Sequence, residues 1–217
     1  MNLDPDEIGK FVALGGTFHS HQEEKDRSYR WPDLWLVPPE GTIPEHEPIQ
    51  IPDRVEEVKP ASELTAVIGD DLWQASEEEA WEAIKGFTIS NDVTAAGDWP
   101  GWSDPDHSMI TGVGYKVFPT FSPILTEYRP KESKDAYDEL TVEVRVDSEL
   151  AVEGSTAQMA FSIPEMVSFA SNIVKLEAND VIALGDPGNP TRTLDDVETV
   201  TCSIETIGKL ENPVERL

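Results

Sequence analysis

The apolar residues of this chain fall into short runs, and this pattern limits the possible folds more than any other feature. The longest runs, such as Phe11–Leu14 and Val181–Leu184, are far shorter than the ~20 residues that a membrane-spanning helix needs. Prolines recur between positions 31 and 60 and disfavour regular helix there. The sequence therefore predicts short strands and turns, and no passage through a membrane.

Local signals place several elements along the chain. Apolar segments predict strands at 11–14, 64–68, 87–90, 140–146, 181–185 and 200–204. A capping box that begins at Ser76 predicts a helix over residues 77–85, with Gly86 as its stop. Pro164 fits the first turn of a second helix that runs to about residue 174. Many short strands and few helices predict a β-rich α+β fold.

Acidic residues dominate the charge and are spread along the whole sequence. Asp and Glu number 43 against 16 Lys and Arg, which gives a formal net charge of −27. Such a surface repels itself at ordinary ionic strength, whereas at about 1 M salt the Debye length falls to ~3 Å and the repulsion largely disappears. We therefore expect a salt-adapted protein, as from a halophilic archaeon, with an ordinary acidic protein as the alternative. Nucleic-acid binding is disfavoured, because the sequence has no cluster of Lys and Arg to contact phosphates.

Two further features bear on the cellular compartment. The first ten residues are acidic and lack the apolar core of a secretion signal, so a cytoplasmic protein is expected. Cys202 is the single cysteine, which excludes an intrachain disulfide. Its strand-like neighbours predict a small, buried side chain.

Five segments, in order along the chain, resemble motifs of the fumarylacetoacetate hydrolase family. They are Ser62–Gly69 (a Glu-x-Glu strand in the family), Gly86–Ala95 (a strand that ends in Asn-Asp-Val-Thr-Ala), Lys116–Phe118 with Pro123, Ser155–Pro164, and Asn179–Pro187. With their surroundings they span nearly the whole chain. Their order and spacing together support the resemblance more than any one segment does.

The resemblance implies a mixed β-roll with a few short helices, commonly assembled as a homodimer. Residues 61–217 would form the catalytic β-roll, and residues 1–60 an N-terminal segment with a lid-like helix and a proline-rich connection. The family's chemistry is metal-dependent hydrolysis, decarboxylation or keto–enol isomerisation of 2-oxo or 1,3-dioxo acids, with Mg²⁺ or Mn²⁺ held by three carboxylates. Hard divalent ions prefer such oxygen ligands and polarise the carbonyl of a chelated 2-oxo acid.

Two acidic residues match metal-ligand positions of the family. Asp92 lies in the most specific motif, and Glu63 matches the second Glu of the Glu-x-Glu pair. Alternation along a strand would put positions 61 and 63 on one face, but position 61 is Ala61, so one ligand is missing. Asp186 and the acidic pair at 56–57 are the candidates for a replacement carboxylate.

The remaining candidate residues would bind and transform the substrate. His21 and Glu24 match a His–Glu pair that activates water on a short helix in smaller family members, and their spacing brings the side chains together on a helix. Lys116 matches the family's substrate-binding lysine. Asp186 occupies a substrate-contact position where the family has threonine, and its charge would repel an anionic carboxylate. Val37 also replaces a lysine of many family members, and the arginine that usually follows the Asp92 motif is missing. These three losses together argue against the family's usual dicarboxylate substrates.

Two interpretations stay open from the sequence. In one, the chain is a divergent enzyme that acts on an acylpyruvate-like or oxaloacetate-like acid. In the other, it is a non-catalytic homologue with a degraded metal site that serves as a binding or assembly partner. The retained site residues favour the enzyme. A zinc site at His19 and His21 fits less well, because no matching downstream ligand set is present.

Overall fold

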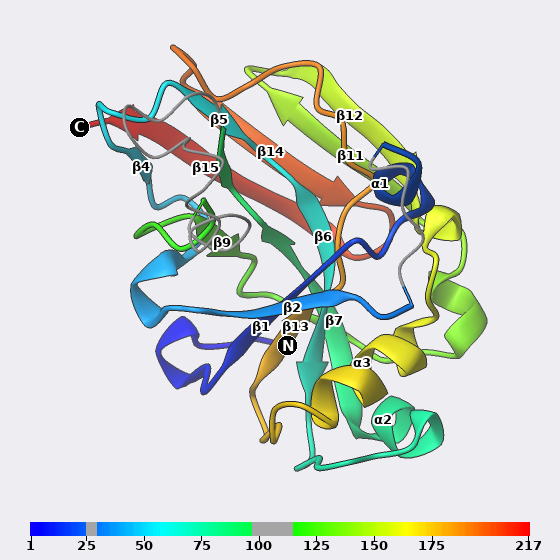
Figure 1. Cartoon of the computed structure of the whole chain (residues 1–217). Helices are drawn as coiled ribbons and strands as arrows, with labels where there is room; N and C mark the ends of the chain where they lie inside the picture. The colour runs from blue at the N-terminus through cyan, green and yellow to red at the C-terminus, as the bar shows by residue number, and fades with distance from the viewer. Residues whose placement is uncertain (25–29, 97–114) are drawn as a thin grey trace, which may run out of the picture.

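The structure, a computed structural model, describes residues 1–24, 30–96 and 115–217, with the side chain of Glu24 outside the described part. Two β-sheets pack against each other, and short helices lie at their margins (Figure 1). The β-rich α+β fold predicted from the sequence is therefore confirmed.

The larger sheet has eight strands of mixed direction. These are β1 (Phe11–Gly15), β2 (Asp33–Val37), β3 (Thr42–Pro44), β6 (Ser62–Ile68), β7 (Ile84–Asn91), β9 (Ser122–Ile124), β10 (Arg129–Pro130) and β13 (Val181–Ala183). Their order is β2-β1-β13-β6-β7-β9-β3, and β10 pairs with β7. β6 lies in the middle and runs antiparallel to both neighbours, β13 and β7. The first residues of β6 and the last residues of β7 therefore lie side by side, where these two central strands end.

The smaller sheet has five strands and covers one face of the larger. Its strands are β4 (Ile49–Ile51), β11 (Thr141–Val146), β12 (Glu149–Ser155), β14 (Thr199–Ile204) and β15 (Gly208–Arg216). They follow the order β12-β11-β14-β15-β4, with only the β15–β4 pair parallel among them. A separate two-stranded ribbon joins β5 (Glu57–Lys59) to β8 (Thr94–Ala96).

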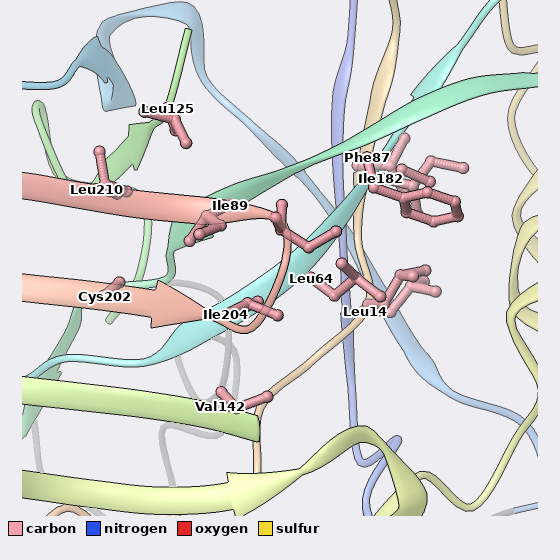
Figure 2. Packing of buried hydrophobic residues seen from close by; sticks show 14 of the residues in the cluster. Leu14, Leu64, Phe87, Ile89, Leu125, Val142, Ile182, Cys202, Ile204 and Leu210 are labelled. Carbon is pink, nitrogen blue, oxygen red and sulfur yellow. The ribbon is translucent and has the colours of Figure 1, made fainter. Parts of the chain in front are cut away.

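The main hydrophobic core lies between the two sheets (Figure 2). Leu64 and Ile89 from the larger sheet are buried in one cluster with Val142, Cys202 and Ile204 from the smaller one. Cys202 is thus a buried free thiol, as the sequence predicted. Successive side chains of a strand point to opposite faces, so the residue before Leu64 is directed away from this core. That residue is a glutamate, and it belongs to the site described below.

Two helices pack together at one end of the larger sheet (Figure 1). They are α2 (Glu77–Ala83) and α3 (Ile163–Ser171). Each begins with a capping box, in which the serine before the helix and a glutamate three residues later exchange hydrogen bonds. α3 ends at Ser171, earlier than predicted, because the following chain turns to pair Leu176 with the backbone of Leu72.

The predicted end of the first of these helices was wrong. α2 ends at Ala83, and β7 already begins at Ile84, so Gly86 lies inside a strand. A Cβ atom on Gly86 would lie 2.3 Å from the carbonyl oxygen of Arg129. The glycine therefore allows close pairing of β7 with β10, and it does not stop a helix.

The remaining helical segments are short. They are α1 (His19–Glu24) and the 3-10 turns η1 (Pro5–Glu7), η2 (Pro39–Gly41), η4 (Lys134–Tyr137) and η5 (Thr156–Gln158). α1 confirms the predicted helix around His21. Among the described residues, no helix combines the length and the apolar character that crossing a membrane requires.

Candidate active site

The site begins where the central strands β6 and β7 meet. Glu63 is the second residue of β6, and Asp92 directly follows β7. Two hydrogen bonds hold this corner: Asp92 N–H donates to the Ala61 carbonyl at 3.0 Å, and the Asn91 side-chain oxygen accepts from Ala61 N–H at 2.9 Å. The antiparallel pairing thereby brings two carboxylates, distant in sequence, to one wall of a cavity.

Lys116 reaches the same corner from a separate segment. Its Nζ donates to an Asp92 carboxylate oxygen and, at 2.8 Å, to the Thr94 hydroxyl. The ammonium also lies 5.2 Å from the ring centroid of Trp35, a distance that permits a cation–π contact. Lys116 is therefore held by a carboxylate, a hydroxyl and an aromatic face while it lines the cavity.

His21 lines the same cavity from α1. Its Nε2 lies 3.9 Å from a carboxylate oxygen of Asp186. The other Asp186 oxygen accepts from Gly188 N–H at 2.7 Å. The sequence paired His21 with Glu24, whose side chain lies outside the described part of the structure. The carboxylate that the structure brings to His21 is that of Asp186.

A cavity of about 640 Å³ connects these groups, a volume within the ~300–1,000 Å³ typical of small-molecule sites. Its described lining is Leu14, Gly15, Gly16, His21, Asp33, Leu34, Trp35, Lys59, Pro60, Ala61, Glu63, Asp92, Thr94, Lys116, Gly185, Asp186, Gly188, Asn189 and Pro190. Five of the six predicted site residues thus face one cavity, and Glu24 is the exception because its side chain is not described. Ala61 also lines this cavity, at the place where the resemblance led us to expect a ligand.

Burial and crowding of negative charge set the electrostatics of the site. Burial raises the pKa of Glu63 well above its ordinary value, and the nearby charges of Asp92 and Asp186 raise it further. Burial also raises the pKa of Asp92, against the opposing attraction of Lys116. For Lys116, burial lowers the pKa, but the charge and hydrogen bond of Asp92 outweigh it, so its pKa is raised and the amine stays protonated. The Lys116 ammonium thus interacts with the charges of three carboxylates, those of Asp92, Glu63 and Asp186.

The oxygen donors fit a divalent ion held by two carboxylates better than one held by three. Glu63 and Asp92 are buried, with exposed fractions of 1% and 5%, and both line the cavity. Within the described residues, no three acidic, histidine or cysteine side chains gather as a metal-binding group. Glu57, a candidate replacement ligand, pairs with Lys59 outside the carboxylate corner, and neither it nor its neighbour Glu56 lines the cavity. Two carboxylates suffice for Mg²⁺, which keeps several waters.

Several residues of the site escaped the sequence reasoning. Thr94 and Trp35 contact Lys116, and the backbone N–H of Gly185 donates to the Glu63 carboxylate at 2.9 Å. Gly185 has a φ of +88°, and a Cβ atom there would lie 1.9 Å from the Thr17 hydroxyl. In the sequence, only Gly185 indicated one of these contacts, because glycine tolerates positive φ and close backbone approach.

The match of residues 10–215 to the model of the fumarylacetoacetate (FAA) hydrolase C-terminal domain decides the family. The chain belongs to the fumarylacetoacetate hydrolase family. Among solved structures of similar fold is a 5-carboxymethyl-2-hydroxymuconate delta-isomerase from Mycobacterium smegmatis. It superposes with a TM-score of 0.79 at 27% identity and covers 97% of this chain and 80% of its own. The mixed β-roll expected from the resemblance is therefore confirmed.

Relatives with described activities match over nearly the whole of this family member. A 4-hydroxyphenylacetate degradation bifunctional isomerase/decarboxylase of Salmonella dublin is 30% identical over 210 residues, which are 95% of this chain and 47% of that protein. A mitochondrial oxaloacetate tautomerase of Xenopus laevis is 30% identical over 212 residues, 94% of this chain and 65% of that protein. The chain thus spans less than two thirds of each of these two relatives.

Proposed function

We propose that this protein is an isomerase or decarboxylase of a small 2-oxo acid and works through an enolate. The observation that carries the proposal is the half-buried Lys116 ammonium, held by Asp92 at the wall of the cavity that His21 also lines. Isomerisation of a 2-oxo acid and loss of a carboxylate β to its keto carbonyl both pass through an enolate, so one arrangement of residues serves both. The names of the isomerase/decarboxylase and tautomerase relatives support this reaction class.

Lys116 and its partners would stabilise the charge that develops in the reaction. An enolate carries negative charge on the former carbonyl oxygen, and a preorganised ammonium beside that oxygen lowers its free energy. Asp92 and Thr94 fix the position of the ammonium before the substrate arrives. Trp35 adds an apolar wall beside it.

His21 is the residue best suited to move the proton. A keto–enol shift needs a base near the carbon next to the carbonyl, and histidine is suited to this task near neutral pH. Its side chain is partly exposed to the cavity, with an exposed fraction of 23%. As a base, His21 would take the proton from that carbon and return it to the other end of the enolate.

A divalent cation, Mg²⁺ or Mn²⁺, belongs to the same proposal. Glu63 and Asp92 would hold it, together with water and the substrate's own oxygens. When bound, such an ion polarises the carbonyl and neutralises the enolate. The cytoplasmic location and the homodimer expected from the family resemblance also remain part of the proposal.

A non-catalytic role is the second candidate, and one observation favours it. Ala61 stands in the wall of the cavity where a third carboxylate was expected, and the Lys116 ammonium already neutralises part of the charge of Asp92. A protein with this arrangement could have lost its metal and kept the fold as a binding or assembly partner.

Calorimetric titration of Mn²⁺ and Mg²⁺ into chelator-treated protein at high salt separates the two candidates. We expect one site per chain, lost in Asp92→Asn, a variant that keeps an oxygen to accept from Lys116. Asp33→Ala is the matched control, because Asp33 lines the same cavity but is exposed and lies outside the carboxylate corner. It should bind as the wild type does. A folded wild-type protein that binds neither ion would favour the non-catalytic role.

A further inference from the structure

α1 is fixed to the segment that follows β13 by direct contacts. The Ser20 hydroxyl donates to the carbonyl of Pro187 at 2.7 Å. Just before the helix, the Thr17 carbonyl accepts from Ala160 N–H at 2.7 Å, and the Gln22 amide donates back to the Gly16 carbonyl at 3.3 Å. The helix is therefore bonded to the 185–190 segment, most of whose residues line the cavity.

Gly188 provides the space in which His21 sits. Its φ is +76°, a left-handed conformation that favours glycine. A Cβ atom on Gly188 would lie 2.5 Å from His21 Nε2 and 3.0 Å from Cδ2. The imidazole thus packs directly on the backbone of this turn, and any larger residue would displace it.

The Asp186 carboxylate has a different partner for each of its two oxygens. Oδ2 accepts from Gly188 N–H at 2.7 Å, which fixes the plane of the carboxylate. Oδ1 then faces His21 Nε2 at 3.9 Å. This separation is longer than a hydrogen bond, but at such a distance the negative charge still favours a proton on the nearer ring nitrogen. Catalytic hydrogen bonds are often long before the substrate binds and shorten in the complex.

We infer that Asp186 is the positioning residue of His21 and sets its tautomer. The carboxylate keeps the proton of the neutral imidazole on Nε2 and leaves Nδ1 as the basic nitrogen. The orientation that the sequence attributed to Glu24, on the same helix, thus comes from a residue on the turn against which the helix packs. The inference rests on the proposed function for the reaction that His21 serves, but the tautomer itself is a property of the protein without substrate.

Asp186→Asn gives a sharp test, because the Gly188 N–H group fixes the orientation of the new amide. Gly188 N–H can only donate, so it takes the oxygen of Asn, and the amide NH₂ turns towards His21 Nε2. A donor at that place favours the opposite tautomer, with the proton on Nδ1. An asparagine in place of a histidine-orienting aspartate imposes the wrong tautomer in the same way in serine proteases.

The measurement is the long-range ¹⁵N–¹H correlation spectrum of the imidazoles, recorded without substrate at a pH where histidine is neutral. His21→Gln identifies the resonances of His21. We expect the Nε2–H form in the wild type, the Nδ1–H form in Asp186→Asn, and the wild-type form in Glu24→Gln, the matched control. An unchanged tautomer in a folded Asp186→Asn variant would overturn the inference, as would a switch in Glu24→Gln in its place.

Turnover separates a failure of this inference from a failure of the proposed function. With an active substrate, Asp186→Asn should lower kcat by about 10–100-fold, the scale typical for the loss of a carboxylate that orients a histidine ligand. The KM should change much less, because the substrate contacts of Lys116 remain. A tautomer switch in a protein that turns over no 2-oxo acid would support the inference and count against the proposed function.

Discussion

Glu63→Gln should make the metal-free protein more stable and the metal-loaded protein less stable than the wild type. The Glu63 carboxylate is 1% exposed and accepts one backbone hydrogen bond, from Gly185 N–H at 2.9 Å. Asp92 and Asp186 crowd it with like charge, and the Lys116 ammonium, which opposes this effect, is bonded to Asp92. A glutamine oxygen can still accept from Gly185, while the unfavourable charge disappears.

The magnitude follows from the cost of burying a charge without full compensation. Replacing such a carboxylate with an amide that keeps its hydrogen bond should raise the free energy of unfolding by about 1–3 kcal/mol in chelator. For a chain of this length, each 1 kcal/mol corresponds to roughly 2–4 °C in Tm. The wild type should instead gain about 4.1 kcal/mol when Mn²⁺ is present at about 1,000 times its Kd, which exceeds that range. The order of stability of the two proteins should therefore reverse.

Chemical denaturation at fixed high salt, with chelator and then with Mn²⁺, measures both effects. Glu57→Gln is the control, because Glu57 is a half-buried residue of strand β5, does not line the cavity, and pairs only with Lys59 among the residues described. It should change the stability by less than about 0.5 kcal/mol in both conditions. A Glu63→Gln variant less stable than the wild type in chelator would refute the electrostatic reasoning. A variant that gains as much from Mn²⁺ as the wild type would exclude Glu63 as a ligand.

Two more predictions concern stability away from the site. Burial would raise the pKa of Glu45, but hydrogen bonds from the Thr126 hydroxyl at 2.6 Å and N–H at 2.9 Å outweigh it and lower the pKa. Because the folded-state pKa is the lower one, these bonds stabilise the fold above the unfolded-state pKa and are lost as the pH falls through the folded-state value. Glu45→Gln should therefore cost about 0.5–1 kcal/mol at pH 7, reduced by solvent screening, and nothing in strong acid. A urea series at both pH values checks this, and a cost independent of pH would contradict it. The formal net charge of −27 predicts that the thermal midpoint rises from dilute buffer to about 2 M KCl, where the Debye length is below ~3 Å. An unchanged midpoint in thermal scans would remove the argument for salt adaptation.

Local chemistry accounts for the parts of the fold that the sequence predicted well. The helix start at Ser76 depends on hydrogen bonds between residues three positions apart, and strand β11 depends on alternation within a few residues. The end of α2 could not be predicted in this way. Gly86 lies against the backbone of Arg129 and the ring of Tyr128, and both residues are distant from it in the sequence. β15 was also missed. Pro213 lies within it, and proline is untypical of a strand interior, so only the pairing with β14 in the fold reveals the strand.

The candidate site shows the same difference between what local sequence predicts and what tertiary contacts decide. The sequence by itself named the candidate residues: Glu63, Asp92, Lys116, His21 and Asp186 all came from motifs, and the structure brings them to one cavity. Which of them act on one another was decided only by the tertiary structure. The bond from Ser20 to Pro187 spans 167 positions and seats His21 beside Asp186, a pairing that no local spacing encodes. The physical reason is that hydrogen bonds and charges act over a few ångströms, and only packing brings segments so far apart in sequence within that range.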